Sequence, residues 1–375
     1  MHINFQTYRT IKRTLAHTLH TRRNSHQEQH LNTLALLICG IVGAQQVQFA
    51  PIADHAPIRG QKNESLITRF RRFVKHDDIT LEAVWLPFAR AVLAGLAASP
   101  LTILLDGTTA GRGCMVLMAS VVYQGRAIPL LWTVVKGKKG HVPQDVHCAL
   151  IRQLREVIPA QATVLVLGDG EFDGTALQAA IRAATWDYAC RTASNITIYA
   201  ADRVFTVGDL PVQRGAAVAI ADVEMTGARY GPILLIGVWE EVHDEPIYLI
   251  TSLTDAQCAI ESYRLRFRIE CMFAEHKSRG FHIHKSHLKK PERVARLLIA
   301  TSLAYLWVHA VAMFAQAQGW IERFHRKDRC DLSLFQIGVR AIRYAVREGW
   351  RIPVSFVLPA NPLPGPQEPN TFSVR

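Results

Sequence analysis

Four residues with side chains suited to catalysis or phosphate binding lie at helical spacing late in the chain. They are Tyr263, Arg266, Glu270 and Lys277, which read Tyr-x2-Arg-x3-Glu-x6-Lys. At 100° per residue these positions fall at about 0°, 300°, 340° and 320° around a helix, on one stripe ~21 Å long. A lone carboxylate among cations is expected where a metal-binding acid works beside an anionic polymer, and phosphate is the obvious anion. A solvated helix face with salt-bridge spacing fits the same pattern.

Two acids upstream favour the chemical interpretation. The apolar run Leu101–Leu105 ends at Asp106, and a second apolar run at 162–167 is followed by Gly168 and Asp169. Short apolar runs of this kind are typical of buried strands. Each strand is therefore predicted to deliver a carboxylate at its carboxyl end.

Glu171 and Asp173 compete with Asp169 for the second of these positions. We favour Asp169 because it follows the strand directly. Asp173 is better placed to cap the helix that comes next.

With these residues the chain resembles the DDE transposases of bacterial insertion sequences, in the group named for its Tyr-Arg-Glu-Lys signature. All four signature positions match at the right spacing, and Asp106 and Asp169 stand in the places of the first and second acids. The likeness runs from about Thr68 to Leu306, and no residue of the family pattern is missing. It implies a Mg-dependent transposase that binds the terminal inverted repeats of its element, cleaves the ends by hydrolysis and joins the 3′-hydroxyls to target DNA.

Three carboxylates are assigned as catalytic residues and metal ligands: Asp106, Asp169 and Glu270. Phosphodiester hydrolysis and transfer must activate a nucleophile, neutralise the transition state and stabilise the leaving oxyanion, and two Mg²⁺ ions do all three. Mg²⁺ prefers oxygen ligands and keeps several waters, so three carboxylates are enough when DNA supplies further oxygens. Mn²⁺ is expected to be able to substitute.

The resemblance also assigns DNA contacts. It implies that Tyr263 and Arg266 hold a backbone phosphate near the cut and that Lys277 clamps the strand beyond it. A packed aromatic is the alternative for Tyr263. Trp239 is the candidate for stacking on a flipped base, with core packing as the alternative.

Two further basic segments are candidates for DNA binding. A helix is expected over about Glu64–His76, with apolar residues within about 120° of arc and cations opposite. The apolar residues are Leu66, Ile67, Phe70, Phe73 and Val74, and the cations are Arg71, Arg72 and Lys75. A Gly-bracketed loop adds Lys136, Lys138 and Lys139, which suit backbone contact. A solvated helix face and a solvated loop fit these segments equally well.

Three histidines, His282, His284 and His287, are spaced closely enough to suggest a transition-metal site. However, no Cys or carboxylate lies at ligand spacing and basic residues surround them, so the pattern does not favour zinc.

Composition agrees with a large basic protein. The 375 residues are 49% hydrophobic with a formal net charge of +12, which favours a polyanionic partner. Seven cysteines without a CxxC pair are typical of free thiols in a reducing compartment. Leu297–Ala317 is long and apolar enough to span a membrane, but its Ser302 and Tyr305 suit a buried core helix. We expect a cytoplasmic, nucleoid-associated protein that does not bind membranes.

The expected fold is α/β, a ribonuclease-H-like mixed sheet with a β-rich insertion domain, preceded by a helical N-terminal domain and followed by helices. Asp169 and Glu270 are 101 positions apart (270 minus 169), too many for one crossover, and short β-rich runs fill the gap. The expected divisions are a helical DNA-end-binding domain (1–97), a catalytic core (98–195 and 246–290), a β-rich insertion (196–245), a C-terminal helical region (291–352) and a flexible Pro-rich tail (353–375).

The expected partner is double-stranded DNA, both the terminal inverted repeats and the target. Synapsis of two ends implies a homodimer on DNA. Two alternatives stay open: a host nuclease with the same core, which would lack flanking inverted repeats, and a DNA-binding protein without metal-dependent cleavage.

Overall fold

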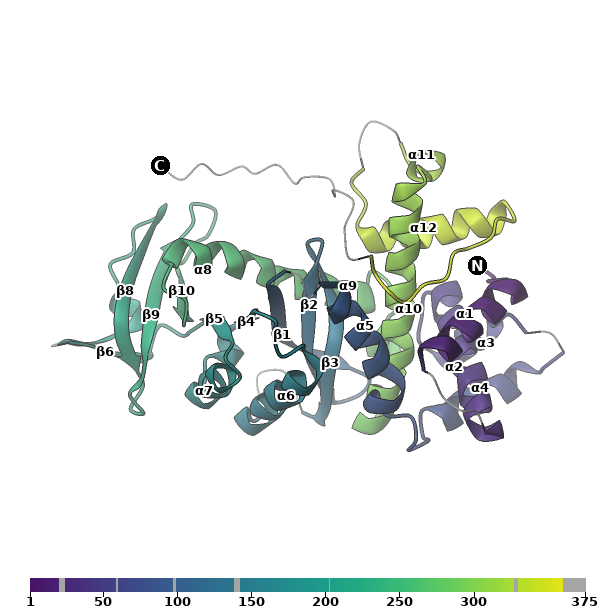
Figure 1. The fold of residues 1–375 in the computed structure, drawn as a ribbon, viewed down its shortest axis with the longest axis horizontal. Helices are drawn as coiled ribbons and strands as arrows, with labels where there is room; N and C mark the ends of the chain where they lie inside the picture. Colours follow the sequence, from purple (N-terminus) through teal and green to yellow (C-terminus); the bar gives the residue numbers. More distant parts are fainter. Residues whose placement is uncertain are drawn as a thin grey trace. The chain divides into compact units, whose positions relative to one another are not determined.

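The chain forms two compact units in a computed structural model (Figure 1) that describes residues 1–19, 24–58, 60–96, 99–137, 142–201, 203–326 and 330–359. A sheet unit contains Leu96–Thr109 and Gly113–Phe273, and a helical unit contains Met1–Gly95, Ala110–Arg112 and Ala274–Arg375.

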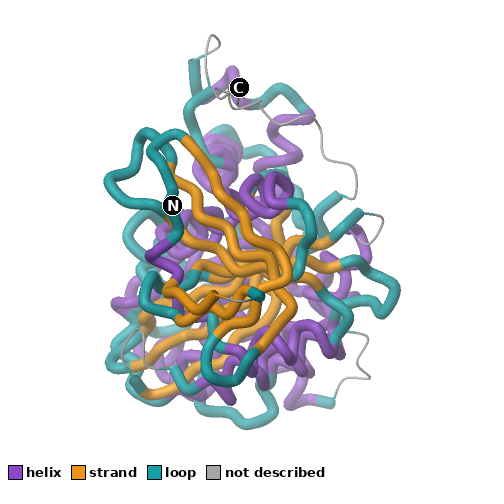
Figure 2. The backbone as a smooth tube through the Cα atoms, turned by 90° about the vertical axis from the view of Figure 1, so that its left-hand side faces the viewer, coloured by secondary structure: helices purple, strands orange, loops and turns teal. Residues whose placement is uncertain are grey.

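One continuous mixed sheet forms the sheet unit, and Figure 2 shows its strands twisting together. The strand order is β3-β2-β1-β4-β5-β10-β9-β8-β6-β7. The β1–β4 and β4–β5 pairs are parallel. The strands are β1 (Leu101–Ala110), β2 (Cys114–Tyr123), β3 (Arg126–Lys136), β4 (Val164–Gly168), β5 (Asp187–Arg191), β6 (Thr197–Ala200), β7 (Arg203–Thr206), β8 (Ala216–Met225), β9 (Tyr230–Trp239) and β10 (Ile247–Thr251).

The first strand is longer than its apolar run suggests. Its parallel pairing with β4 stops at Leu105 and Gly168, but β1 continues to Ala110 beside β2. Asp106 therefore lies within a strand, and the expectation that it would sit at a strand end was wrong. The reason is that pairing with a neighbouring strand, rather than local apolarity, sets where a strand stops.

A two-residue turn joins β2 and β3. Tyr123 pairs with Arg126, and the φ angles of Gln124 and Gly125 are 48° and 66°. Left-handed backbone at both turn positions is what a tight hairpin requires. The two buried strands that follow β1 are thus held in register by a local turn.

The strands between β5 and β10 extend the sheet. β10 pairs with both β5 and β9, and β8 pairs with β9 and β6. The expected β-rich insertion at 196–245 is therefore continuous with the sheet that carries β1 and β4. Two helices that pack beside each other, α6 (Gln144–Val157) and α7 (Thr175–Ala183), connect the parallel strands.

The signature stripe is not one continuous helix. α8 (Ala256–Tyr263) runs into a 3₁₀ turn, η4 (Arg264–Arg266), which runs into α9 (Phe267–His276). Tyr263 packs against an apolar cluster of β9, β10 and α8, whereas Ile269 is buried on α9. The 3₁₀ turn has fewer residues per turn than an α-helix, so α8 and α9 can each bury a different face. The expectation that the four signature residues share one stripe of a single helix was therefore wrong.

The helical unit contains α1 (Phe5–Thr18), α2 (Ser25–Ala44), α3 (Phe49–Asp54), α4 (Asn63–Phe73), a π-helical turn (Leu81–Trp85), α5 (Leu86–Leu96), α10 (Pro291–Ala317), α11 (Ile321–Phe324) and α12 (Leu334–Arg347). In the described part of the chain, α10 is the one helix long and apolar enough to cross a membrane, and 89% of its most apolar window is buried inside the protein. Burial of that extent is also what a core helix shows.

The amphipathic pattern of α4 is confirmed. Its apolar residues are buried and its cations Arg71, Arg72 and Lys75 are exposed. The burial of the apolar face stabilises the helix and leaves the cations in solvent.

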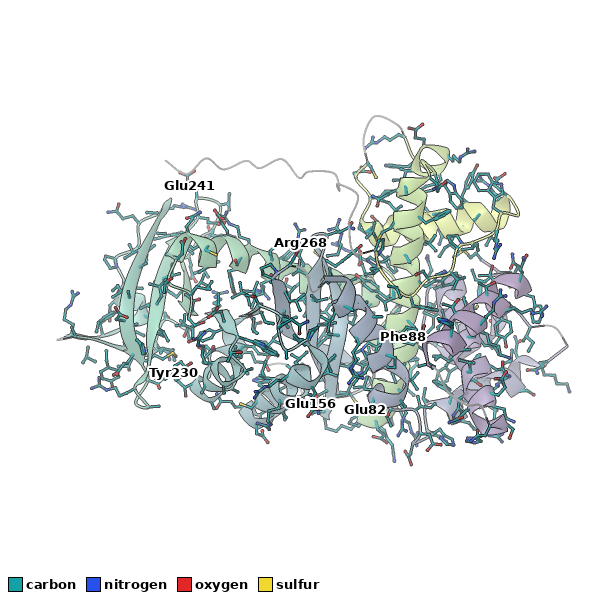
Figure 3. The ribbon with its side chains drawn as sticks, in the orientation of Figure 1. Glu82, Phe88, Glu156, Tyr230, Glu241 and Arg268 are labelled. Atoms are coloured by element: carbon teal, nitrogen blue, oxygen red, sulfur yellow. The ribbon has the colours of Figure 1, made fainter. Side chains whose placement is uncertain are left out.

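The chain after α12 is partly packed. Trp307 donates a hydrogen bond from Nε1 to the carbonyl of Pro353 at 2.9 Å, and Phe356 packs edge-on against Phe88, labelled in Figure 3, with 5.5 Å between ring centroids. The expectation of a flexible tail from residue 353 is thus wrong for this first part, because Phe356 is a buried anchor. Residues 360–375 lie outside the described part.

The crossing of α10 and α12 depends on Gly338. A Cβ at this position would lie 2.1 Å from the carbonyl oxygen of Val308. In an isolated helix Gly→Ala stabilises by about 1 kcal/mol, but overpacking a rigid backbone contact costs about 1–3 kcal/mol.

We therefore expect Gly338→Ala to lower the free energy of unfolding, measured by denaturant titration. Arg340→Ala, at an exposed position of the same helix, is the matched control and should change it by less than about 0.5 kcal/mol. A more stable Gly338→Ala protein would show that the two helices can move apart without loss.

Candidate active site on the parallel strands

The register of three strands brings three charged residues into one row. Leu105 on β1 pairs with Gly168 on β4, which pairs with Cys190 on β5. The next positions are Asp106, Asp169 and Arg191. Residues in register on neighbouring parallel strands lie ~4.8 Å apart and point to the same face. Two carboxylates and one cation therefore share one face of the sheet.

Asp106 is a buried carboxylate, with 1% of the residue exposed. Its Oδ1 accepts a hydrogen bond from the backbone N–H of Gly107 at 2.6 Å. Its Oδ2 lies 3.7 Å from Nη1 of Arg266. A buried charge must be paired and hydrogen-bonded. Gly107 on the strand provides the hydrogen bond, and Arg266 on η4 provides the opposite charge.

Glu270 joins the same guanidinium from α9. Nη2 of Arg266 donates to Oε1 of Glu270, one helical turn later in the chain. The pKa of Arg266 is raised, because Tyr263, Glu270 and Asp106 together outweigh the desolvation that burial causes. Arg266 thus stays charged and links a strand carboxylate to a helix carboxylate.

Asp169 lies beside Asp106 at the end of β4. Its Oδ1 accepts from the backbone N–H of Glu171 at 3.0 Å and so begins the short 3₁₀ helix η2 (Gly170–Phe172). Among the described residues, Asp106, Asp169 and Glu270 do not form a group whose ligand atoms all lie within 4.8 Å of one another. The structure therefore brings Asp106 and Glu270 to Arg266 and places Asp169 next to Asp106 by register, without closing the three carboxylates into one cluster.

Glu171, one competitor for the second position, faces the other side of the sheet. Its Oε2 would lie 3.5 Å from a Cβ on Gly107, and its Oε1 lies 3.9 Å from Nε2 of buried His147 on α6. Successive residues of a strand point to opposite faces, so a carboxylate against Gly107 is on the face away from Asp106. Burial lowers the pKa of His147, which favours its neutral form.

Asp173, the other competitor, is held by a side-chain contact. Thr192 donates from Oγ1 to Oδ2 of Asp173 at 2.9 Å, and burial raises the pKa of Asp173. The residue before α7 is Gly174, and no side chain caps that helix. The expectation that Asp173 would cap α7 was wrong, because the η2 turn aims its carboxylate at Thr192.

Tyr263 is half-buried in the apolar cluster of β9, β10 and α8. Burial raises its pKa, against the opposing effect of Arg266, whose guanidinium carbon lies 6.0 Å from the ring centroid. Tyr263 therefore packs as an aromatic and also lies beside the cation of the site.

The remaining candidates lie elsewhere. Trp239 ends β9, is partly exposed and donates from Nε1 to the carbonyl of His243 at 3.0 Å. Lys136 ends β3 in an exposed position, whereas Lys138 and Lys139 are outside the described residues. Lys277 follows α9 in the helical unit, which also contains Arg71, Arg72 and Lys75.

Arg191 is a site residue that the sequence patterns did not single out. It is exposed at the end of β5 and contributes to the electrostatic environment of Tyr263. The sequence did contain a signal for Arg191, because it follows a short apolar run, as Asp106 and Asp169 do.

The donor set suits a hard divalent cation. Its side chains offer only carboxylate oxygens, the ligands that Mg²⁺ prefers. Asp106 lies within β1, and Asp169 follows β4 directly. The residues present therefore fit a magnesium-type site, in which Arg266 balances the negative charge.

Comparisons with known proteins place this chain in a family. No curated protein matches the sequence. One similar solved structure is a cryo-EM structure of the piggyBac transposase synaptic complex with hairpin DNA, with 11% identity, a TM-score of 0.45 and coverage of 98% of this chain and 85% of that chain. The family model described as the transposase DDE domain matches residues 98–307, more than half of the chain. The chain therefore belongs to the DDE-domain transposases.

Proposed function

We propose that this DDE transposase serves a bacterial insertion sequence of the Tyr-Arg-Glu-Lys group and that its sheet unit is a ribonuclease-H-like catalytic core. The observation that supports the proposal is the parallel register of β1 and β4, in which Leu105 pairs with Gly168 directly before Asp106 and Asp169, together with the link from Asp106 to Glu270 through Arg266. DNA cleavage and strand transfer are the activities of the family.

The proposed reaction has two steps at one site. Water attacks the phosphodiester at the element's end and leaves a 3′-hydroxyl, which then attacks a phosphodiester of target DNA and displaces its 3′-oxygen. A pair of Mg²⁺ ions held by Asp106, Asp169 and Glu270, with Mn²⁺ able to substitute, would supply Lewis-acid stabilisation of the attacking and leaving oxygens.

Arg266 is the proposed phosphate-binding residue nearest the chemistry. A guanidinium presents a planar fork that binds phosphate in a bidentate manner. In the structure Nη2 donates to Glu270, and Nη1 lies within ion-pair distance of Asp106 without a hydrogen bond. DNA phosphate and the two carboxylates therefore compete for the same donors. Arg191, in line with Asp169, adds a second exposed cation to this face.

Further DNA contacts are proposed from Lys277, Lys136, Trp239 and the exposed cations of α4. The net charge of +12 supports a nucleic-acid partner, because cations near phosphate release counterions. We further propose that the protein acts as a homodimer on two terminal inverted repeats and is cytoplasmic and nucleoid-associated.

The central test is Glu270→Gln, which keeps the side-chain shape and removes a metal-binding charge. Cleavage of end DNA in Mg²⁺ should fall by at least about 100-fold, because several kcal/mol of charge stabilisation are lost, while binding of end DNA survives. Glu261→Gln, with the same change on an exposed residue of α8, should cleave like the parent. Retained cleavage by Glu270→Gln would remove Glu270 from the site.

The assignment of the second acid is tested by Asp169→Asn and Asp173→Asn. Asp169→Asn should abolish cleavage of a radiolabelled end, because the amide is a poor ligand for Mg²⁺. Asp173→Asn keeps an oxygen that can accept from Thr192, so cleavage should stay within a few-fold of the parent. The reverse order of effects would transfer the ligand role to Asp173.

The salt dependence of end-DNA binding distinguishes residues that bind DNA phosphate from residues that bind the metal. Lys277→Ala and Arg266→Ala should each lower the log-log slope of affinity against salt by about one for each DNA phosphate that the variant no longer neutralises. Glu270→Gln should leave the slope nearly unchanged. Arg264→Ala is the control, because both Nε and Nη2 of Arg264 already donate to Glu240. Parental slopes in the Lys277 and Arg266 variants would mean that neither residue binds phosphate.

A further inference from the structure

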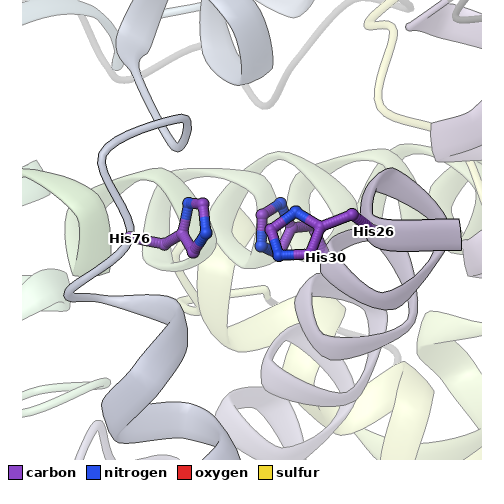
Figure 4. Close-up of side chains that lie close together, drawn as sticks. All are labelled: His26, His30 and His76. Carbon is purple, nitrogen blue, oxygen red and sulfur yellow. The ribbon is translucent and has the colours of Figure 1, made fainter. Parts of the chain in front are cut away.

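Three histidines from two segments of the helical unit meet far in sequence from every carboxylate of the candidate active site. His26 and His30 are one turn apart on α2, and His76 follows the end of α4. One potential ligand atom from each lies within 4.8 Å of the other two. Figure 4 shows the three rings gathered together. We propose that His26, His30 and His76 form a binding site for a transition-metal ion of the Zn²⁺ type.

The ring arrangement supports binding to one ion. The centroid distances are 4.4 Å for His26 and His30, 4.4 Å for His30 and His76, and 4.7 Å for His26 and His76. In a tetrahedral site with bonds of about 2.0–2.1 Å, ligand nitrogens lie ~3.4 Å apart. The three ligand atoms, which all lie within 4.8 Å of one another, are close to this separation.

The environment keeps these imidazoles available as ligands. The pKa of His30 is lowered, chiefly by burial and then by His76 and His26. His30 also packs edge-on against Phe73, with 6.3 Å between centroids, which fixes its ring.

Asp78 provides the opposite charge. Its backbone N–H donates to Nδ1 of His76 at 3.3 Å, and its Oδ2 lies 3.8 Å from the same nitrogen. Nε2 of His76 is therefore the ring nitrogen left for the metal. Arg69 lines the same pocket, and its Nε donates to Oγ1 of Thr33 at 2.8 Å.

Such a site would join α2 to the end of α4. Those segments are also joined by packing and by the hydrogen bonds of Arg69 to Thr33 and Gln29. α4 carries the exposed Arg71 and Arg72, with Lys75 just beyond its end. The ion would fix the end of the helix that presents these cations. This role is structural and separate from the oxygen-only carboxylate site.

The test uses full-length protein with any purification tag removed, stripped of metal by chelator and titrated with Co²⁺ in saturating Mg²⁺. One equivalent of Co²⁺ should bind with visible d–d absorption, and Zn²⁺ should displace it. Excess Zn²⁺ should raise the melting temperature by roughly 5 °C, because it binds only the folded state.

Substitution locates the ion. His26→Asn, His30→Asn and His76→Asn should each weaken Co²⁺ binding by at least about tenfold, since each removes a ligand. His26 is exposed, so its replacement leaves the core intact, as circular dichroism would verify. His2→Asn, a histidine of the same unit outside the cluster, should bind Co²⁺ like the parent, and so should Glu270→Gln.

Two results would overturn the site. One is the absence of a Co²⁺ equivalent in the parent, and the other is an equivalent that His26→Asn and His30→Asn both retain. Either would mean that the three rings are packed neutral histidines. Because the readout is metal binding, the outcome does not depend on whether the protein cleaves DNA.

Discussion

The parallel pairing of β1 with β4 is the constraint on which the site depends. It fixes Asp106 beside Asp169, and a shift of one residue would turn Asp106 to the opposite face, where Glu171 and His147 lie. Both strands are almost wholly buried, so the register is held by apolar side chains on two faces. Packing of the sheet interior therefore determines which carboxylates can act together.

Burial of Asp106 creates an electrostatic requirement that Arg266 meets. A carboxylate in a low-dielectric interior is costly unless it is paired and hydrogen-bonded. Arg266 contacts Asp106 and Glu270 at once, which a lysine, with a compact ammonium group, could not do with the same geometry. The need for a planar, permanently charged group explains why an arginine suits this position whether or not DNA is bound.

Local patterns predicted individual strands and helix faces better than the connections between them. Apolar runs revealed the strands that carry Asp106 and Asp169, and the face of α4 followed from its periodicity. The continuation of β1 past Asp106, the merging of β6–β9 into the main sheet and the packing of Phe356 could not be predicted, because each depends on partners far away in sequence. The 3₁₀ turn at Arg264–Arg266 could not be predicted for a related reason. Residue spacing was interpreted on the assumption of one continuous helix, whereas α8 and α9 are two helices that bury different faces.

The cations of this protein divide into two kinds, with different consequences for DNA binding. Arg71 and Arg72 lie in solvent on a helix whose opposite face supplies the packing energy, so the DNA contacts proposed for them would not disturb the packing of the helix. Arg266 is already paired in the folded protein, and its transfer to phosphate must be offset by another positive charge at Asp106 and Glu270. An ion bound by those carboxylates would provide that charge. Metal binding and phosphate binding at Arg266 are therefore expected to favour each other, which would couple DNA engagement to assembly of the catalytic site.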